Sequence, residues 1–173
     1  ASGFDMGFQN QDLSTMNCSL QPDSKEVRWC SSLPAESTDS LDQLLFHNPN
    51  QGIWNEFLEA TIARVGSPVI HTRSDGRIFI ELETPGAVQS LVAVFDSEPV
   101  GAVVYSRMNE SLRVLFLAVH EEWTLVNRGS DAIFFQVIDR LDSIAQRIAG
   151  IQNVVFFPGS ERELRFKVKK RNG

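Results

Sequence analysis

Three polar residues, His120, Glu121 and Glu122, directly follow an apolar segment at 112–119. A histidine or a glutamate at the end of a buried strand is well placed to take a proton from an ammonium nucleophile, directly or through water. We therefore single out Glu122 and His120 as candidate general bases. The alternative interpretation is structural, because a polar triplet after a strand is also the ordinary solvated exit of that strand.

The next segment, 124–132, carries Arg128, Gly129 and Ser130 ahead of a long amphipathic stretch. The first amides of a helix have no partner within the helix, and a glycine lets the backbone approach a ligand closely, so such a segment can bind an anion. Ser130 is also a natural helix cap. The sequence thus predicts an anion site at these three residues, with the carboxylate of Asp131 opposing it by like-charge repulsion.

Several other kinds of site find no support. Cys18 and Cys30 form neither a CxxC motif nor a cluster with histidine, so no metal site is expected. His47 and His71 have no cysteine or carboxylate at ligand spacing, which favours surface or packing roles. The chain contains no G-x-S-x-G elbow and no phosphate-binding G-x-x-x-x-G-K-[ST] motif. The two cysteines can form a local disulfide if the compartment is oxidising.

The candidate residues must be positioned by the elements that flank them. Apolar residues three or four positions apart predict a helix over 133–148 that buries one face. An uninterrupted apolar run at 153–157 predicts a strand that is buried on both faces. Because strand, helix and strand in this order form a right-handed crossover, the strand at 153–157 should lie parallel to the one at 112–119.

The preceding part of the chain predicts two helices and a series of strands. The predicted strands are 69–73, 77–83, 91–95, 100–107 and 112–119, and the helices begin at Ser40 and near Trp54. The turn Ser74-Asp75-Gly76 predicts a hairpin of 69–73 and 77–83. The connections between 91–95, 100–107 and 112–119 are so short that they can join only antiparallel neighbours, which predicts a meander. Residues 1–38 read as a polar, largely irregular arm, and 39–173 as a single α+β domain with a mixed sheet flanked by helices.

The text of 91–104, LVAVFDSEPVGAVV, resembles the hairpin of the GNAT superfamily of acyl-CoA N-acyltransferases. The text of 117–123, LAVHEEW, is similar to the strand end in that family. The resemblance implies that the strands at 112–119 and 153–157 part to open a slot for acetyl-CoA or another acyl-CoA. It implies that the backbone of Val119 pairs with the pantetheine arm, and that Arg128, Gly129 and Ser130 hold the pyrophosphate. It further implies acyl transfer to a small-molecule or peptide amine, with Glu122 or His120 as the base.

Two other interpretations stay open. Asp131 stands where the family places a second glycine, and the family's usual tyrosine acid has no counterpart, which favours a non-catalytic interaction or regulatory module that has lost CoA binding. A longin- or profilin-like scaffold would keep the two parallel strands paired. If Phe134 and Phe157 reach the surface together, they would form an apolar patch suited to a homodimer or a protein partner.

Composition limits the partners. The net charge of -6, from 16 basic and 22 acidic residues, argues against a nucleic-acid or anionic-membrane partner. Basic residues gather in 158–173, where alternation with apolar residues predicts one solvated edge strand. No apolar run is long enough for a bilayer-spanning helix, and a cytoplasmic location is expected.

Overall fold

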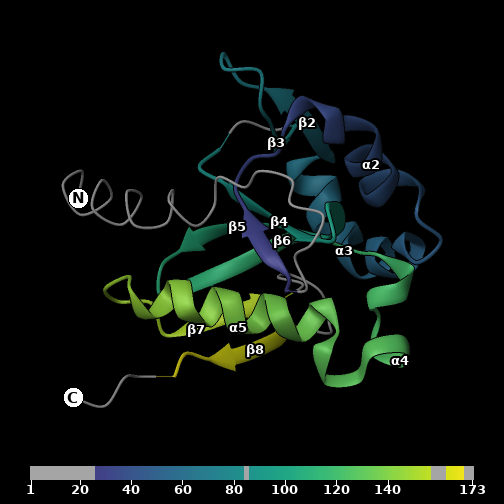
Figure 1. Ribbon diagram of the computed structural model, residues 1–173. Helices are drawn as coiled ribbons and strands as arrows, with labels where there is room; N and C mark the ends of the chain where they lie inside the picture. The colour runs from purple at the N-terminus through teal and green to yellow at the C-terminus, as the bar shows by residue number, and fades with distance from the viewer. Residues whose placement is uncertain (1–25, 84–85, 157–162, 170–173) are drawn as a thin grey trace.

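A computed structural model describes residues 26–83, 86–156 and 163–169 of the chain (Figure 1). The helical elements are η1 (Ala35–Ser37), α2 (Thr38–Asp42), the π-helix η2 (Gln43–His47), α3 (Gln51–Val65), η3 (Glu121–Trp123), α4 (Leu125–Arg128), η4 (Gly129–Asp131) and α5 (Ile133–Gln146). The strands are β1 (Arg28–Cys30), β2 (Pro68–Thr72), β3 (Ile78–Leu82), β4 (Gln89–Phe95), β5 (Glu98–Met108), β6 (Ser111–Val119), β7 (Asn153–Phe156) and β8 (Leu164–Lys167). In these ranges, no helix has the length and apolar character needed to cross a membrane.

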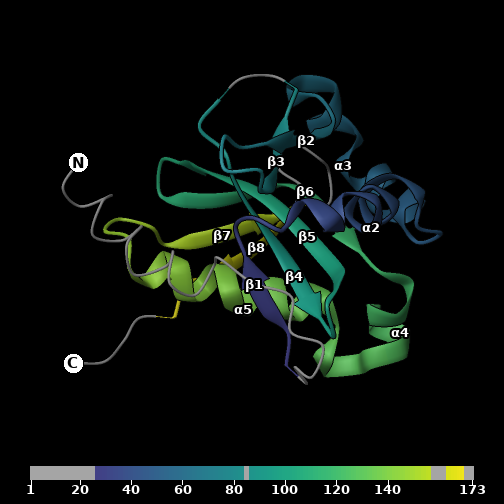
Figure 2. The ribbon, with the colours of Figure 1, turned by 45° about the horizontal axis from the view of Figure 1, so that its top comes forward.

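Six strands form one mixed sheet in the order β1-β4-β5-β6-β7-β8, while β2 and β3 form a separate hairpin (Figures 1 and 2). Neighbouring strands of the sheet are antiparallel except β6 and β7, which are parallel and are connected through α5. The predicted α+β class, the meander and the parallel crossover strand are therefore confirmed. Short connections and a right-handed crossover leave few other ways to arrange these segments.

A β-bulge lies in the middle of the sheet. Val104 of β5 pairs with Phe116 of β6, whereas the next residue, Tyr105, pairs with Val114, so β6 carries one extra residue. A bulge bends the strand that contains it and increases its twist. The last described pair of β6 with β7 joins Val114 and Phe156, at the same level, and β6 continues through 115–119. The residues after Phe156 lie outside the described residues, so the parting of the two strands that the resemblance to the GNAT superfamily implied stays a prediction.

Helix α5 packs on the sheet with its first residue. Ile133 is fully buried, and a Cβ added to Gly101 of β5 would lie 2.5 Å from its Cγ2. The predicted apolar face is confirmed, since Val137, Leu141 and Ile144 are also buried. The predicted cap is wrong: the N-cap position is Ala132, and no side chain caps it. Burial of Ala132 and Ile133 against the sheet determines where the helix begins.

The end of the predicted irregular arm is part of the sheet. Strand β1 pairs with β4 from Arg28 opposite Val94 to Cys30 opposite Val92. Cys30 is fully buried and disulfide-bonded, and Leu33 is buried. The expectation of little packed structure therefore does not hold for 28–37, because three residues without strand periodicity can still complete an edge. Residues 1–25, including Cys18, lie outside the described residues.

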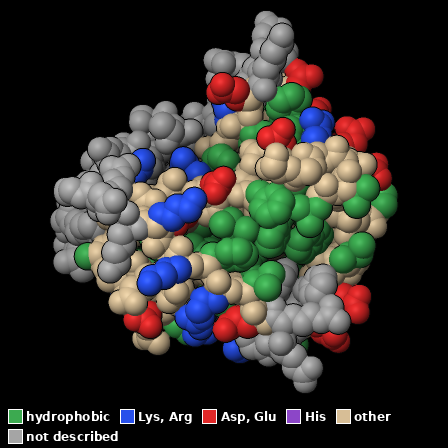
Figure 3. Space-filling view, turned by 90° about the horizontal axis from the view of Figure 1, so that it is seen from below, with side chains coloured by type: hydrophobic (Ala, Val, Ile, Leu, Met, Phe, Trp, Pro, Cys, Tyr) green, Lys and Arg blue, Asp and Glu red, His purple; other side chains and the backbone are tan. Residues whose placement is uncertain are grey.

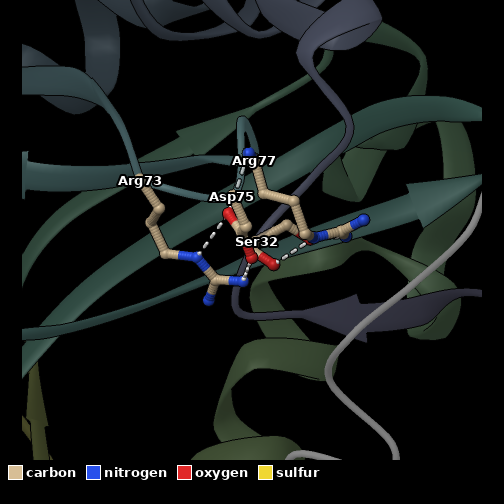
Figure 4. Close-up of polar contacts among 4 residues, drawn as sticks. All are labelled: Ser32, Arg73, Asp75 and Arg77. Atoms are coloured by element: carbon tan, nitrogen blue, oxygen red, sulfur yellow. Dashed lines mark hydrogen bonds and ion pairs between the residues drawn. The ribbon is translucent and has the colours of Figure 1, made fainter.

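The hairpin β2–β3 is attached to the segment after β1. Leu33 and Ile78 exchange two backbone hydrogen bonds of 2.9 Å. Arg77 donates to the Ser32 hydroxyl at 2.7 Å and to the Ser32 carbonyl at 2.9 Å (Figure 4). At the predicted turn, Asp75 accepts from Arg73 at 2.6 Å and from the Arg77 amide at 3.0 Å. The hairpin is thus connected to the domain by paired polar groups as well as by apolar contacts.

An aromatic cluster joins α3, α5 and the last two strands. The Phe134 ring lies 5.8 Å from Trp54, 5.1 Å from Phe156 and 6.4 Å from Phe166. Phe135, the next residue of α5, is 41% exposed. Figure 3 shows apolar side chains gathered on the face that carries α5 and β8. Phe134 is thus half-buried at the centre of the cluster, and Phe157, its predicted companion, lies outside the described residues.

Candidate functional site

A cavity of about 600 Å³ lies at the carboxyl end of β6. Three segments form its walls: α2 with η2 and the two residues after it, the turn between β4 and β5, and the segment from His120 to Arg128. The lining residues are Asp39, Ser40, Gln43, Leu44, Asn48, Pro49, Phe95, Asp96, Glu98, Pro99, Val100, His120, Glu121, Glu122, Trp123 and Arg128. A volume of this size is typical of small-molecule sites.

The cavity brings together some of the predicted site residues. His120, Glu122 and Arg128 line it, whereas Val119, Gly129 and Ser130 do not. Gly129 and Ser130 are exposed. The structure therefore places the two candidate bases and Arg128 on a common wall of the cavity. It separates them from Gly129 and Ser130, the other two residues of the predicted anion site.

The imidazole of His120 is held by a hydrogen bond from a nearby backbone amide. Its Nδ1 accepts a hydrogen bond of 3.1 Å from the Glu122 amide at the start of η3. A neutral imidazole has one acceptor nitrogen, so the proton of a neutral His120 belongs on Nε2. That nitrogen can donate a hydrogen bond but cannot accept a proton. This geometry opposes the predicted role of His120 as a base and leaves the carboxylate of Glu122 as the candidate.

Arg128 is held against the wall of the cavity. Its guanidinium carbon lies 4.0 Å from the centre of the Trp123 ring, a cation–π contact. Its Nε donates to the Glu122 carbonyl at 3.0 Å. Trp123 is buried and packs edge-on against Phe95 at 5.0 Å. The stacking and the hydrogen bond give Arg128 a structural role in fixing the segment that carries Glu121 and Glu122.

The walls of the cavity carry many more acids than bases. Five carboxylates line it, belonging to Asp39, Asp96, Glu98, Glu121 and Glu122, against the single guanidinium of Arg128. Among the described residues, none of the five takes part in an ion pair. A cleft lined by one sign of charge attracts ligands of the opposite sign. The cavity therefore favours a cation over a phosphate-bearing ligand.

Two of these carboxylates stand on a strained turn. Phe95 pairs with Glu98, which leaves Asp96 and Ser97 as a two-residue hairpin turn with φ values of 50° and 68°. Positive φ at both positions is typical of the type I′ turn, which favours asparagine or aspartate followed by glycine. Serine at the second position is strained. The turn nevertheless brings Asp96 and Glu98 to the rim of the cavity.

The free edge of β6 is occupied by side chains of the protein. Asn50 Nδ2 donates to the Val119 carbonyl at 3.3 Å, and Gln51 Nε2 donates to the Leu117 carbonyl at 2.9 Å. Val119 is the residue whose backbone was expected to pair with a pantetheine arm. An acyl-CoA bound in that way would have to displace these amides, and Gln51 is only 2% exposed.

The segment ahead of α5 also lacks the expected anion cradle. Gly129 has a φ of 56°, and a Cβ added there would meet nothing within 4 Å, so the glycine serves the backbone conformation rather than a close approach. Gln136 donates to the Asp131 carbonyl at 2.7 Å. The first helical amides begin beyond Ala132, which is fully buried. These residues do not fit a CoA pyrophosphate in the predicted arrangement.

Sequence reasoning missed most of the cavity. Five of its lining residues were not predicted as site residues: Asp39, Gln43, Asn48, Asp96 and Glu98. No spacing signal relates them, because they come from the ends of separate elements that meet only in the folded chain. Groups of three or more histidine, cysteine or acidic side chains suited to a metal ion are absent from the described part of the chain.

Comparisons with known proteins gave matches among solved structures. No protein-family model matches the chain, and no curated protein sequence matches it. One similar solved structure is a tandem GNAT protein from the clavulanic acid biosynthesis pathway, with a TM-score of 0.42 and 14% identity over 76% of this chain and 36% of that one. Another is the GNAT-like decarboxylase GphF in complex with isobutyryl-CoA, with a TM-score of 0.39 and 14% identity over 76% of this chain and 64% of that one. The chain thus spans less than two thirds of the length of either protein.

Proposed function

We propose that this domain binds a cationic amine in the cavity at the end of β6 and acts as a non-catalytic GNAT-like interaction module. The observation that carries the proposal is the set of five carboxylates around a cavity of about 600 Å³, none of which forms an ion pair within the described part of the chain. An ammonium group placed there would form charge-assisted hydrogen bonds with them.

The walls suit an amine that carries some apolar surface. Phe95, Trp123, Pro99 and Leu44 line the cavity between the carboxylates. Such a lining can cover the methylene groups of an alkyl amine or of a lysine side chain while the charge lies among the acids. The proposed ligand is therefore a small-molecule or peptide-borne primary amine.

A second candidate function is acyl-CoA-dependent N-acyl transfer to the same amine. The observation in its favour is that Glu122 lines the cavity near the end of β6, and that β6 continues past its last described pair with β7. In that case Glu122 would take the proton from the ammonium group. The arrangement of Asn50, Gln51 and the segment at 128–132 favours the module over the enzyme, because it leaves no prepared place for the thioester arm or its pyrophosphate.

The test uses spermidine as the probe and measures its binding by calorimetry. The double variant Glu98→Gln/Glu122→Gln neutralises two cavity carboxylates. The control Glu59→Gln/Glu110→Gln neutralises two exposed carboxylates outside the cavity and gives the same net charge. We expect the cavity variant to lose about tenfold or more in affinity, about 1.4 kcal/mol, and the control to keep most of it. Equal losses in both variants would show that spermidine follows net charge alone and would contradict the proposal.

The same preparation separates the two candidate functions. For the module, 1 mM acetyl-CoA should not raise the melting temperature and should not release CoA in the presence of an amine. A ligand present at a hundred times its dissociation constant would stabilise the protein by about 2.7 kcal/mol, which is readily measured. Release of CoA that depends on the amine and is lost in Glu122→Gln would establish the transferase instead.

A further inference from the structure

We propose that the side-chain amides of Asn50 and Gln51 serve as a permanent internal substitute for a neighbouring strand, sealing the edge of the last part of β6. The proposal concerns access to the sheet and does not depend on the amine ligand. The starting observation is that the carbonyls of Leu117 and Val119, in the last part of β6, accept hydrogen bonds from these two side chains. An unpaired strand edge presents backbone groups that must find partners when buried.

The two amides have the spacing of a strand edge. They reach the carbonyls of Leu117 and Val119, which are two residues apart and therefore face the same direction along β6. The donors are successive residues at the start of α3. A neighbouring strand would offer N–H groups to alternate carbonyls in the same way. Two side chains thus supply the hydrogen bonds that β7 supplies lower in the sheet.

Gln51 is fixed by a network of its own. Its Nε2 donates both to Leu117 and to Asn55 Oδ1 at 3.0 Å, and its Oε1 accepts from Asn48 Nδ2 at 3.3 Å. Asn48 in turn donates to the Leu44 carbonyl at 2.6 Å. Both Gln51 donors and its acceptor are therefore satisfied in a buried position. A side chain held by bonds at each polar atom is a built part of the structure.

Aromatic side chains connect the start of α3 to α5 and β7. Trp54, one turn along α3 from Asn50, stacks on Phe134 of α5 with an interplanar angle of 17°. Phe134 packs on Phe156, the last residue of β7. The two helices therefore touch beside Phe156, the last described residue of β7. The polar amides hold the Leu117 and Val119 carbonyls, and this aromatic stack connects α3 to α5 and β7.

Asn50 and Gln51, which we call the seal of β6, directly follow two residues of the cavity wall. Asn48 and Pro49 line the cavity and immediately precede Asn50 and Gln51. The same turn between η2 and α3 therefore shapes the cavity and caps β6. Opening the edge would also move a cavity wall, so the domain must keep the seal closed to keep the cavity.

The direct test is hydrogen exchange of side-chain amides by NMR. The Gln51 side-chain NH₂ should exchange at least tenfold more slowly than that of Gln136, which also donates to a backbone carbonyl but at a more exposed position. The variant Gln51→Leu keeps a similar volume without donors and should accelerate backbone exchange at 115–119. Asn55→Ala, which leaves both contacts with β6 in place, is the matched control and should leave that exchange nearly unchanged.

Binding of acetyl-CoA provides a second readout. Wild-type protein should not bind 1 mM acetyl-CoA, whether or not it binds spermidine. Fast exchange of the Gln51 side-chain amide in the wild type, or acetyl-CoA binding that protects 115–119, would overturn the seal. If Gln51→Leu does not fold, Asn50→Ala removes only the 3.3 Å bond and should accelerate exchange near Val119, and unchanged exchange there would count against the proposal.

Discussion

The hairpin β2–β3 and the cavity at the end of β6 differ in how their charged side chains are paired. In the hairpin, Arg73 pairs with Asp75, and Arg77 donates to Ser32 (Figure 4). Around the cavity, five carboxylates stand without ion pairs among the described residues, on segments that include a strained turn. Paired groups contribute to the architecture, whereas carboxylates that form no ion pair in the described part of the chain stay available to a ligand. The difference separates a region that serves the fold from one suited to a ligand.

The largest expected effect comes from breaking the hairpin's attachment. Arg77→Ala removes both hydrogen bonds to Ser32, which is 1% exposed, and leaves buried acceptors without this donor. We expect the free energy of unfolding, measured in urea, to fall by about 2 kcal/mol. Arg73→Ala breaks only the more exposed ion pair with Asp75 in the same hairpin. It should change the free energy of unfolding by less than about 0.5 kcal/mol. Equal effects would mean that Arg77 does not attach the hairpin to the domain.

A smaller effect is expected at the rim of the cavity. Ser97→Gly relieves a positive φ of 68° and should raise the free energy of unfolding by roughly 0.5 kcal/mol, since glycine's greater freedom in the unfolded chain offsets part of the gain. Ser74→Gly, in the other hairpin turn, relieves no positive φ and should not stabilise. Thermal melting of both variants checks the difference. A destabilised Ser97→Gly would show that the turn is not strained.

The smallest effect concerns the pH dependence of the exposed hairpin pair. The hydrogen bond from Arg73, followed by that from the Arg77 amide, lowers the pKa of Asp75 from 3.8 to about 2. Because the folded state favours the ionised carboxylate, its contribution is present above pH 3.8 and is lost as the pH falls through about 2. Asp75→Asn should weaken the dependence of the melting temperature on pH in this acidic window and leave that dependence unchanged above pH 5. An identical acid limb in the variant would contradict this assignment.

Local patterns in the sequence predicted the elements well. The four-residue spacing of Ile133, Val137 and Leu141 marked α5, and the short connections marked the meander. Predictions failed where the deciding contact was distant in sequence. Strand β1 exists because β4 lies beside it, and α5 begins at Ile133 because this residue packs on Gly101. Neither contact leaves a trace in the local pattern.

The site was predicted only in part, for the same reason. His120 and Glu122 were found because they follow an apolar strand, and the structure places both on the cavity wall. Asp39 and Asp96 come from a short helix and a turn far away in sequence. The role of His120 depends on one hydrogen bond from the Glu122 amide, which residue types alone do not reveal.

The sequence by itself determined the order of strands and helices, the parallel crossover and the polar exit of β6, because periodicity and loop length act over a few residues. Only the tertiary structure decided that carboxylates from three segments surround one cavity, and that Asn50 and Gln51 fill the edge of β6. Charge repulsion and hydrogen bonding act through space, and the distances on which they depend are set only when the chain has folded.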